Sequence, residues 1–537
     1  MLRLEREYID DPLKRGEWRD AGIKLPDYDI GEVVLSTVQT PRWLHFGAGS
    51  TFRGVIAMLQ QQLLDAGETD GGIIAAESFD YDIIDRVCAP YDNISLLVRT
   101  PSSGDVRMDV VASVAEAFRT DIHIERLREV FSSPSLQMVS FTITGKGYDL
   151  TGINGDLTQD VRHDISSGLW NVRHTISIVT SMMFERFKSG CAPIALVSMD
   201  DRARNGEILR DAMLKIAAEW CAGDFVEDDF IEYLKDEDVV SFPCSIIDNI
   251  TARPSEMTYE MLTDAGIADM SPLITSRGAY AAPFVNAELP LRVVIEDRFP
   301  AGRPPLEKAG VCFSDKRTVL DSGFVKLSAC FDPVQAALAL GCCLLGYGDA
   351  AQGMGDPVIR ALVMRVGYAE GLPAITASGV FEPEKFLKEA VEERLTNRFL
   401  HDDPRRAAED LSGKMPTCLG VTIKTHMERP DLSTDGMIGI PLVIASWFRY
   451  LMGVDDRLTP MPLSGGPMLD EITKSLDGVK VGEPESYRGQ LRRFLSNPAL
   501  FSVDLYEAGL GDRVESLFVQ MLAGEGAAAR TLKSNLS

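Results

Sequence analysis

The stretch Trp43-Leu-His-Phe-Gly-Ala-Gly-Ser-Thr-Phe-Arg-Gly54 decides the fold of the chain. Leu44 to Phe46 predict the end of a short buried strand, Gly47 and Gly49 follow at once, and Phe52 to Leu64 show the apolar periodicity of a helix. A strand, a glycine turn and a helix in this order present backbone N–H groups and a helix N-terminus to a phosphate. Gly47 would allow the tight turn, and Gly49 would let a pyrophosphate approach the backbone.

The third glycine of the usual G-x-G-x-x-G pattern is missing, because Phe52 stands in its place and Gly54 comes two residues later. A G-x-G alone is equally compatible with an ordinary strand-to-helix turn. If the turn does bind a dinucleotide, we expect Gly47, Gly49, and the start of the helix at Phe52 and Arg53 to contact it.

A second predicted strand, Gly72-Ile-Ile-Ala-Ala-Glu77, ends in an acid 23 residues beyond Gly54. In dinucleotide-binding folds an acidic side chain at the end of the second strand holds the adenosine ribose hydroxyls. Glu77 is the candidate, with Asp80 behind it. A carboxylate there would repel a 2′-phosphate, which favours NAD over NADP. The alternative is that Glu77 merely begins a polar loop.

Composition excludes several classes of protein. The 537 residues predict two or three domains, and the net charge of −26 argues against nucleic acid or an anionic membrane surface as a partner. The nine cysteines have no C-x-x-C spacing, which excludes a zinc cluster or disulfide framework and fits a reducing cytoplasm. The N-terminus has no apolar signal core, and the apolar run from about Ala336 to Tyr347 is too short to span a bilayer.

The order of the predicted elements gives an α/β fold class and three segments. Residues 1–40 are polar and turn-rich and predict an N-terminal arm. Residues 41–300 alternate strands and helices, which predicts a Rossmann-type dinucleotide-binding domain with a parallel sheet. Residues 301–537 are mainly helical and predict a second, helical domain, with the boundary at Arg298–Pro305. The predicted strands are 44–46, 72–77, 94–99, 136–144, 194–198 and 291–296, and the residues after about 526 are expected to fray.

Several ordered motifs resemble one family, the polyol-specific long-chain dehydrogenases, which include mannitol 2-dehydrogenase, fructuronate (mannonate) reductase and tagaturonate reductase. The resemblance covers residues from about 40 to 480, and the uronate-reductase branch is the more similar. Its motifs are Leu44–Gly54, Val139-Ser-Phe-Thr-Ile-Thr-Gly-Lys-Gly-Tyr148, Val197-Ser-Met-Asp-Asp-Arg-Ala-Arg-Asn-Gly206, Phe242–Pro254, Val293-Val-Ile-Glu-Asp-Arg-Phe-Pro300, Val325-Lys-Leu-Ser-Ala-Cys-Phe-Asp-Pro-Val-Gln335 and Ile440–Tyr450.

The resemblance implies a Rossmann-type domain, a helical C-terminal domain and a substrate cleft between them. It also implies zinc-independent hydride transfer between NAD and a ketose or keto-uronate. A lysine serves as the general acid/base, two asparagines donate hydrogen bonds to the reacting oxygen, and a histidine follows the second asparagine by three residues. Arg406 and Lys414 match the family's substrate-holding arginine and lysine.

The chain departs from the family at the catalytic positions. The first asparagine falls at Asp201, the second at Asp332 and the histidine at Gln335, while the nearest lysine is Lys326. A glutamate that usually precedes Lys-Gly-Tyr is Gly145. An asparagine N–H can donate to a developing alkoxide, whereas an ionised aspartate cannot. Two carboxylates would also favour the charged form of Lys326, so we expect the standard chemistry to be impaired.

Each of these residues has an alternative explanation. Lys326 could be a solvated residue before a buried helix, Asp332 an N-cap beside Pro333, and Gln335 a partner for first-turn backbone donors. Arg406 and Lys414 could form surface pairs only. Asp201, Asp332 and Gln335 could together bind a hard cation, although nothing in the sequence requires a metal.

The leading hypothesis is an NAD-dependent oxidoreductase that acts on a small sugar or sugar acid, as a cytoplasmic monomer or homodimer. The second hypothesis is a non-catalytic relative that keeps the nucleotide fold and serves in binding or regulation. The third is a metal-assisted enzyme with altered chemistry. Turnover of NADH separates the first hypothesis from the second, and loss of activity on chelation identifies the third.

Overall fold

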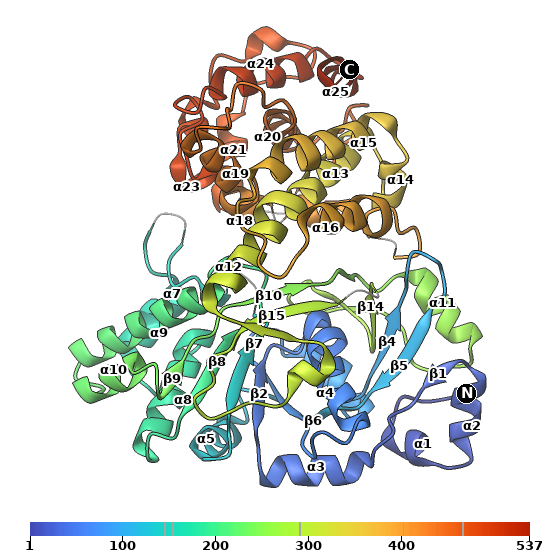
Figure 1. Cartoon of the computed structure of the whole chain (residues 1–537), viewed down its shortest axis with the longest axis vertical. Helices are drawn as coiled ribbons and strands as arrows, with labels where there is room; N and C mark the ends of the chain where they lie inside the picture. Colours follow the sequence, from blue (N-terminus) through green and yellow to red (C-terminus); the bar gives the residue numbers. More distant parts are fainter. Residues whose placement is uncertain are drawn as a thin grey trace. The chain divides into compact units, whose positions relative to one another are not determined.

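The computed structural model describes residues 1–143, 147–152, 155–288, 291–400, 402–409, 411–463 and 467–536. The chain divides into two compact units, Met1–Val319 and Leu320–Ser537. Among the described residues, the strands lie in the first unit, and the regular elements of the second unit are helices (Figure 1). The expected glycine-turn stretch lies in the first unit, and Lys326, Asp332, Arg406 and Lys414 lie in the second.

A six-stranded parallel sheet forms the centre of the first unit. Its strands lie in the order β6-β3-β2-β7-β8-β9. If the strands of this sheet are numbered by their order in the chain, this spatial order is 3-2-1-4-5-6. This is the doubly wound order of dinucleotide-binding folds, and the strand order reverses beside β2. The predicted Rossmann-type α/β fold is therefore confirmed. The strands are β2 (Trp43–Phe46), β3 (Ile73–Glu77), β6 (Val114–Arg119), β7 (Met138–Phe141), β8 (Ile194–Ser198) and β9 (Val240–Ser241).

Both faces of this sheet are covered, which explains why its strands are continuous apolar runs. Side chains alternate between two cores: Leu44 and Ile74 belong to one, while Trp43 and Ile73 belong to the other. Helices α5, α8 and α9 contribute to the first core and α4 to the second (Figure 1). These helices are α4 (Ala57–Asp65), α5 (Ile124–Ser132), α8 (Thr175–Lys188) and α9 (Asn205–Ala222); the unit also has α7 (Gln159–Ser167), α10 (Asp228–Lys235) and α11 (Glu256–Asp264).

The expected strand 94–99 belongs to a different sheet. It is β4 (Ser95–Arg99) in the order β1-β5-β4-β14-β11, and the third strand of the parallel sheet is β6 instead. Ser95–Arg99 is the more buried of the two segments, whereas Val114–Arg119 carries Glu116 and Arg119 and is only partly buried, so composition alone favours the wrong segment for the parallel sheet. The other strands are β1 (Ile23–Lys24), β5 (Arg107–Val111), β10 (Ser245–Asp248), β11 (Thr251–Ala252), β12 (Leu273–Ile274), β13 (Tyr280–Ala281), β14 (Phe284–Ala287), β15 (Arg292–Glu296) and β16 (Cys312–Ser314).

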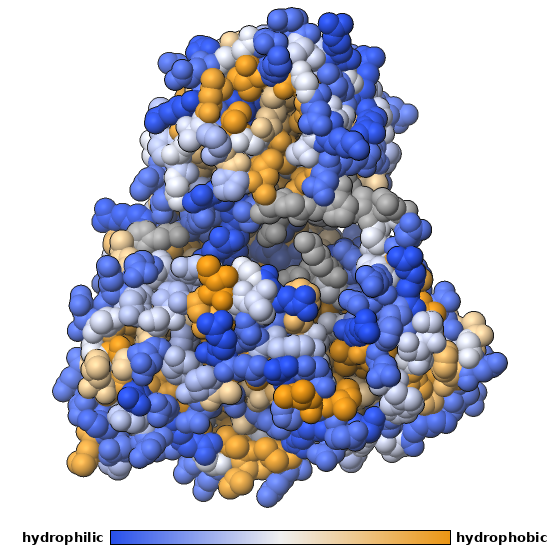
Figure 2. Space-filling model, turned by 180° about the vertical axis from the view of Figure 1, so that it is seen from behind, coloured by the Kyte–Doolittle hydropathy of each residue, from blue (hydrophilic) through white to orange (hydrophobic). Residues whose placement is uncertain are grey.

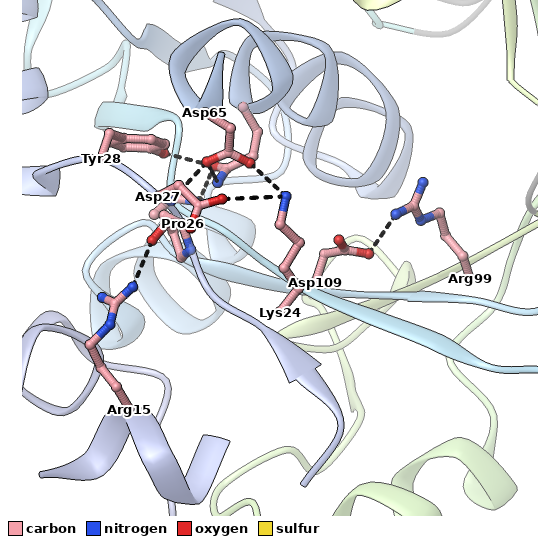
Figure 3. A network of polar contacts seen from close by, with 10 residues as sticks. Arg15, Lys24, Pro26, Asp27, Tyr28, Asp65, Arg99 and Asp109 are labelled. Atoms are coloured by element: carbon pink, nitrogen blue, oxygen red, sulfur yellow. Dashed lines mark hydrogen bonds and ion pairs between the residues drawn. The ribbon is translucent and has the colours of Figure 1, made fainter. Parts of the chain in front are cut away.

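The first 40 residues, expected as an arm, form α1 (Arg6–Asp10), α2 (Lys14–Asp20), β1 and α3 (Ile30–Gln39). Ile9 and Trp18 are fully buried. A polar network ties this segment to the end of α4 (Figure 3). Lys24 Nζ contacts Asp65 Oδ2 at 3.2 Å, and the Asp27 backbone N–H donates to Asp65 Oδ1 at 2.9 Å. The segment therefore supports the helix that follows the glycine turn.

The second unit is built around α13 (Asp332–Leu345). The described part of this unit is mainly helical, as the sequence predicts. The last residues form a helix as well, because Asp456 caps α25 by accepting from the N–H groups of Ala528 at 2.8 Å and Ala529 at 3.0 Å. Helix α12 (Lys316–Gly323) begins in the first unit and ends in the second. The other helices of the second unit are α14 (Ala350–Met354), α15 (Pro357–Met364), α16 (Pro383–Glu389), α17 (Pro404–Glu409), α18 (Leu411–Met415), α19 (Val421–Glu428), α20 (Gly439–Tyr450), α21 (Pro467–Ser475), α22 (Arg492–Leu495), α23 (Pro498–Phe501), α24 (Gly511–Met521) and α25 (Ala527–Leu536).

One helical stretch, Lys316–Leu345, is long and apolar enough to cross a membrane by composition alone. The expected apolar run from Ala336 is only its second half. Its most apolar window is 94% buried within the protein, as in the core helix of a globular domain.

The surface is mostly hydrophilic, with separate apolar patches (Figure 2). Two of the exposed aromatic side chains lie beneath arginines. Arg277 stands 4.7 Å above the Phe79 ring and Arg128 stands 4.9 Å above the Trp170 ring. Single exposed apolar side chains are normal on protein surfaces, so exposure alone does not indicate a function, and the place of the side chain relative to a site must be considered.

Candidate active site

The glycine turn after β2 has the geometry that the sequence predicts. Gly47 has φ +99°, and a Cβ there would stand 2.3 Å from the Thr142 carbonyl oxygen, so only glycine fits. A Cβ on Gly49 would meet nothing within 4 Å, so this side of the turn is open. The helix begins at Ser50, and its first N–H groups have no intrahelical acceptor. The turn can therefore receive a phosphate at the point where the sheet order reverses.

Phe52 and Arg53 support the turn from inside. Phe52 begins a π-helical turn, Phe52–Ile56, and its buried ring stacks on His45 with the ring centres 4.3 Å apart. The buried Arg53 guanidinium donates to the Ala48 carbonyl at 3.1 Å and to the Ala282 carbonyl at 2.9 Å. Burial lowers the pKa of Arg53. These side chains hold the turn in place, and their contact with a cofactor stays a prediction.

Glu77 joins the turn to the loop that follows β3. Its Oε2 accepts from the Ala48 N–H at 2.9 Å. Its Oε1 accepts from the N–H groups of Ser78, Phe79 and Asp80 at 3.0, 2.9 and 3.2 Å. Burial raises the pKa of Glu77, and the four N–H groups oppose that shift. Glu77 is thus a structural residue as well as a candidate for the ribose, and the ribose contact stays a prediction.

The segment after β8 carries Asp201, which is exposed. Its neighbour Asp200 accepts from the Ile143 N–H at 2.9 Å and from the Tyr148 hydroxyl at 2.7 Å. Asn205, buried at the start of α9, donates to the carbonyl oxygens of Ser198, Asp200 and Ser245 at 3.0–3.1 Å. Asn205 lies in the motif Val197–Gly206, and its hydrogen bonds tie the segment after β8 to the start of β10, which the sequence does not show. Gly145, where the family has glutamate, lies outside the described residues.

Lys326 is buried in the second unit. It lies on a π-helical turn, Phe324–Cys330, with 4% of its surface exposed, and its carbonyl accepts from the Phe331 N–H at 3.0 Å. The alternative of a solvated lysine is therefore wrong. A buried lysine on a widened helical turn is a common arrangement for a functional group.

The structure brings Asp332 and Lys414 together. Lys414 Nζ lies 3.6 Å from Asp332 Oδ2, with side chains 34% and 6% exposed. Asp332 is the first residue of α13, and the cap position is Phe331, which has no side-chain cap. The N-cap explanation of Asp332 is therefore wrong. Gln335 is half-buried in the first turn, where its N–H donates to the Phe331 carbonyl at 2.9 Å.

Arg406 is exposed on α17, in the acidic segment that also holds Asp402. Burial raises the pKa of Asp402 to about 6, and the Arg406 guanidinium opposes the shift. Arg406 therefore has a carboxyl group close enough to interact with it electrostatically. Its predicted contact with substrate stays a prediction.

No group of three or more His, Cys, Asp or Glu side chains with the arrangement of a metal site occurs in the described ranges. Asp201 belongs to the first unit, and Asp332 and Gln335 belong to the second.

Comparison with known families gives matches in both units. The model of the mannitol dehydrogenase Rossmann domain matches residues 41–308, and that of the mannitol dehydrogenase C-terminal domain matches residues 334–510. A D-mannonate oxidoreductase of Thermotoga maritima is 43% identical over 537 residues, which cover 99% of this chain and 98% of the relative. A mannitol 2-dehydrogenase of Aspergillus fumigatus is 26% identical over 459 residues, which cover 84% of this chain and 85% of the relative.

Two solved structures share the fold. Pseudomonas fluorescens mannitol 2-dehydrogenase, in a ternary complex with NAD and D-mannitol, superposes with a TM-score of 0.80 at 22% identity, and the alignment covers 99% of both chains. A substrate-free D-sorbitol dehydrogenase superposes with a TM-score of 0.72 at 20% identity, covering 96% of this chain and 98% of the other.

Proposed function

The chain belongs to the mannitol dehydrogenase family, and we propose that it is an NAD-dependent oxidoreductase that interconverts a keto-uronate and a mannonate-like sugar acid. The observation that carries the proposal is the 43% identity to a D-mannonate oxidoreductase along the whole chain. The alignment with that relative includes both units, so it covers the predicted cofactor residues and the predicted catalytic residues alike.

The cofactor site fits NAD. Gly47 and Gly49 would hold the pyrophosphate on the open side of the turn, because a Cβ on Gly49 meets nothing within 4 Å. Glu77 would lie beside the ribose at the end of β3. When bound, NAD supplies the acceptor or donor of the hydride. The chain supplies the backbone dipoles, which offset the repulsion between an anionic dinucleotide and a protein of net charge −26.

Lys326 is the acid/base in this proposal. In the direction of ketone reduction its ammonium group donates a proton to the ketone oxygen as negative charge develops there. Its burial excludes water from competing for that proton. Asp332 and Gln335 begin the next helix, and the Asp332–Lys414 pair offsets one of the two negative charges that replace the family's asparagines.

Arg406 and Lys414 bind the sugar acid. A guanidinium can hold a carboxylate through two parallel hydrogen bonds, which would distinguish a uronate from a neutral ketose. Lys414 keeps its ammonium beside Asp332 and is 34% exposed, so it can also reach a substrate hydroxyl or carboxylate. The preference for a sugar acid over mannitol follows from these two cations.

The described cysteines are all free thiols, which fits a reducing compartment. We propose a cytoplasmic enzyme, a monomer or homodimer, that acts on a small sugar acid with NAD.

The proposal is tested by measuring the steady-state rates at which NADH reduces D-fructuronate, D-tagaturonate and D-fructose. We expect the uronates to have the higher kcat/KM. Lys326→Met should lower kcat by ~10²–10⁴ and leave NADH binding unchanged. Arg107→Ala, which changes an exposed residue on β5, is the matched control.

Two outcomes would support the other hypotheses. NADH binding without turnover of any substrate would indicate a non-catalytic relative. Turnover that is lost on chelation and restored by a divalent cation would indicate metal-assisted chemistry.

A further inference from the structure

The β12–β13 hairpin lies against the loop after β3. The Thr275 hydroxyl donates to Asp80 Oδ2 at 2.7 Å, and the Ser276 N–H donates to Asp82 Oδ2 at 2.6 Å. Arg86 reaches the base of the hairpin, where it donates to the Ile274 carbonyl at 3.3 Å. The hairpin, about 195 residues further along the chain, is thus held by two contacts to residues 80–82 and by a third to Arg86.

These contacts place one arginine over an exposed aromatic ring. Phe79 is 62% exposed, and the Arg277 guanidinium stands 4.7 Å above its ring. Arg277 is itself exposed and makes no ion pair with any residue that the structure describes. Both side chains lose conformational freedom and gain little burial from this arrangement, so stability alone does not account for it.

The pair lies next to the predicted cofactor site. The Phe79 N–H donates to Glu77 Oε1, and Glu77 Oε2 accepts from the Ala48 N–H in the glycine turn. One carboxylate thus connects the backbone of Phe79 with the turn. In doubly wound folds the adenosine half of a dinucleotide lies at the end of the second strand, which here is β3. The base must then lie beside the loop that starts at Ser78.

We propose that Arg277 and Phe79 form the wall on which the adenine ring of the dinucleotide stacks, with the β12–β13 hairpin as its support. This inference rests on the proposed cofactor. A planar guanidinium stacks well on an aromatic base, and Phe79 fixes the plane of that guanidinium. The cation also adds local positive potential for an anionic ligand near an otherwise acidic protein.

Calorimetric titration of the full-length protein with ADP-ribose, NADH, NADPH and reduced nicotinamide mononucleotide tests the proposal. Arg277→Ala and Phe79→Ala should each raise the Kd for ADP-ribose and NADH about tenfold, as for the loss of one stacking partner of a base. Binding of the mononucleotide, which lacks adenosine, should not change. Arg277→Lys should give an intermediate Kd, because it keeps the charge and loses the planar group.

Arg107→Ala is the control, and unchanged thermal midpoints for all four variants would show that the fold is intact. If the unaltered protein binds NADH and both alanine variants bind it equally well, Arg277 and Phe79 do not stack on the adenine ring, while the proposed function stands. If Arg277→Ala weakens NADPH alone, the guanidinium reads a 2′-phosphate and the stacking proposal fails. If the unaltered protein binds neither NADH nor ADP-ribose, the proposed function itself fails.

Discussion

At the residue scale, the Asp332–Lys414 ion pair changes the charge expected at one of the two positions where the family has asparagine. The sequence predicts two uncompensated carboxylates at positions 201 and 332, where the family has amide donors. The structure places an ammonium 3.6 Å from Asp332, so that charge is partly offset. A carboxylate at positions 201 and 332 cannot donate the hydrogen bond that an amide there would donate to an alkoxide.

Restoring the donors should therefore raise the rate of oxidation of mannonate or mannitol. We expect the triple change Asp201→Asn, Asp332→Asn and Gln335→His to increase kcat at least about tenfold, since one oxyanion donor is typically worth ~10²–10³ in rate. The measurement is NAD reduction under saturating alcohol. Asp512→Asn, at an exposed position in the second unit, is the control. This account of the three positions would be contradicted if the unaltered protein oxidised the alcohol at a rate usual for a dehydrogenase and the triple variant oxidised it more slowly.

His45 makes the stability of the first unit depend on pH. Its ring nitrogens lie 2.6 Å from Ser140 Oγ and 2.8 Å from Thr142 Oγ1, and burial lowers its pKa from 6.5 to about 3. In the unfolded chain His45 takes up a proton below pH ~6.5, while in the folded chain it stays neutral. Its contribution to stability is therefore complete above that pH and is lost as the pH falls.

His45→Gln should make unfolding by urea less sensitive to acid. Between pH 7 and pH 5 the variant should lose about 2 kcal/mol less free energy of unfolding than the unaltered protein. His123→Gln, which changes an exposed histidine, should keep the native pH dependence. Equal pH dependence in all three proteins would show that His45 is not held neutral.

At the element scale, the two glycines of the turn have different physical roles. Gly47 is required by its positive φ and by the Thr142 carbonyl, whereas Gly49 faces open space. Gly47→Ala should lower the free energy of unfolding by about 1–3 kcal/mol, because alanine is strained at this positive φ. Gly49→Val should leave stability unchanged and abolish detectable NADH binding. Thermal denaturation and NADH fluorescence titration measure the two effects, and NADH binding retained in Gly49→Val would exclude the turn as the phosphate site.

Much of the fold could be predicted at this scale, because strands β2, β3, β7 and β8 are apolar runs at the spacing of a parallel sheet. The partner sheet of Ser95–Arg99 could not, since sheet membership depends on contacts distant in sequence. The roles of the candidate site residues stay predictions. Lys326 and Asp332 came from the family pattern, but the Asp332–Lys414 pair and the hairpin contacts at Asp80 join segments far apart in the chain, which no local pattern encodes.

At the scale of the whole molecule, the charge of −26 opposes the approach of both proposed ligands. Raising the ionic strength from ~10 mM to ~150 mM shortens the Debye length from about 30 Å to about 8 Å and so screens this repulsion. We therefore expect kcat/KM for a uronate to rise with salt. The same quantity for neutral D-fructose, measured at saturating NADH, should not change. A fall in kcat/KM for the uronate would show that local cations dominate the approach.

The central claim is that the chain transfers a hydride between nicotinamide and a keto-uronate. Incubation of the purified protein with NADH deuterated at the transferable position and D-fructuronate, followed by mass spectrometry of the sugar-acid product, tests this claim most directly. The account predicts a mannonate-like product that is heavier by one mass unit, with the deuterium on the carbon that was the ketone, and no such product from Lys326→Met. Recovery of unreduced fructuronate under conditions where NADH is bound, or a product without deuterium, would contradict it.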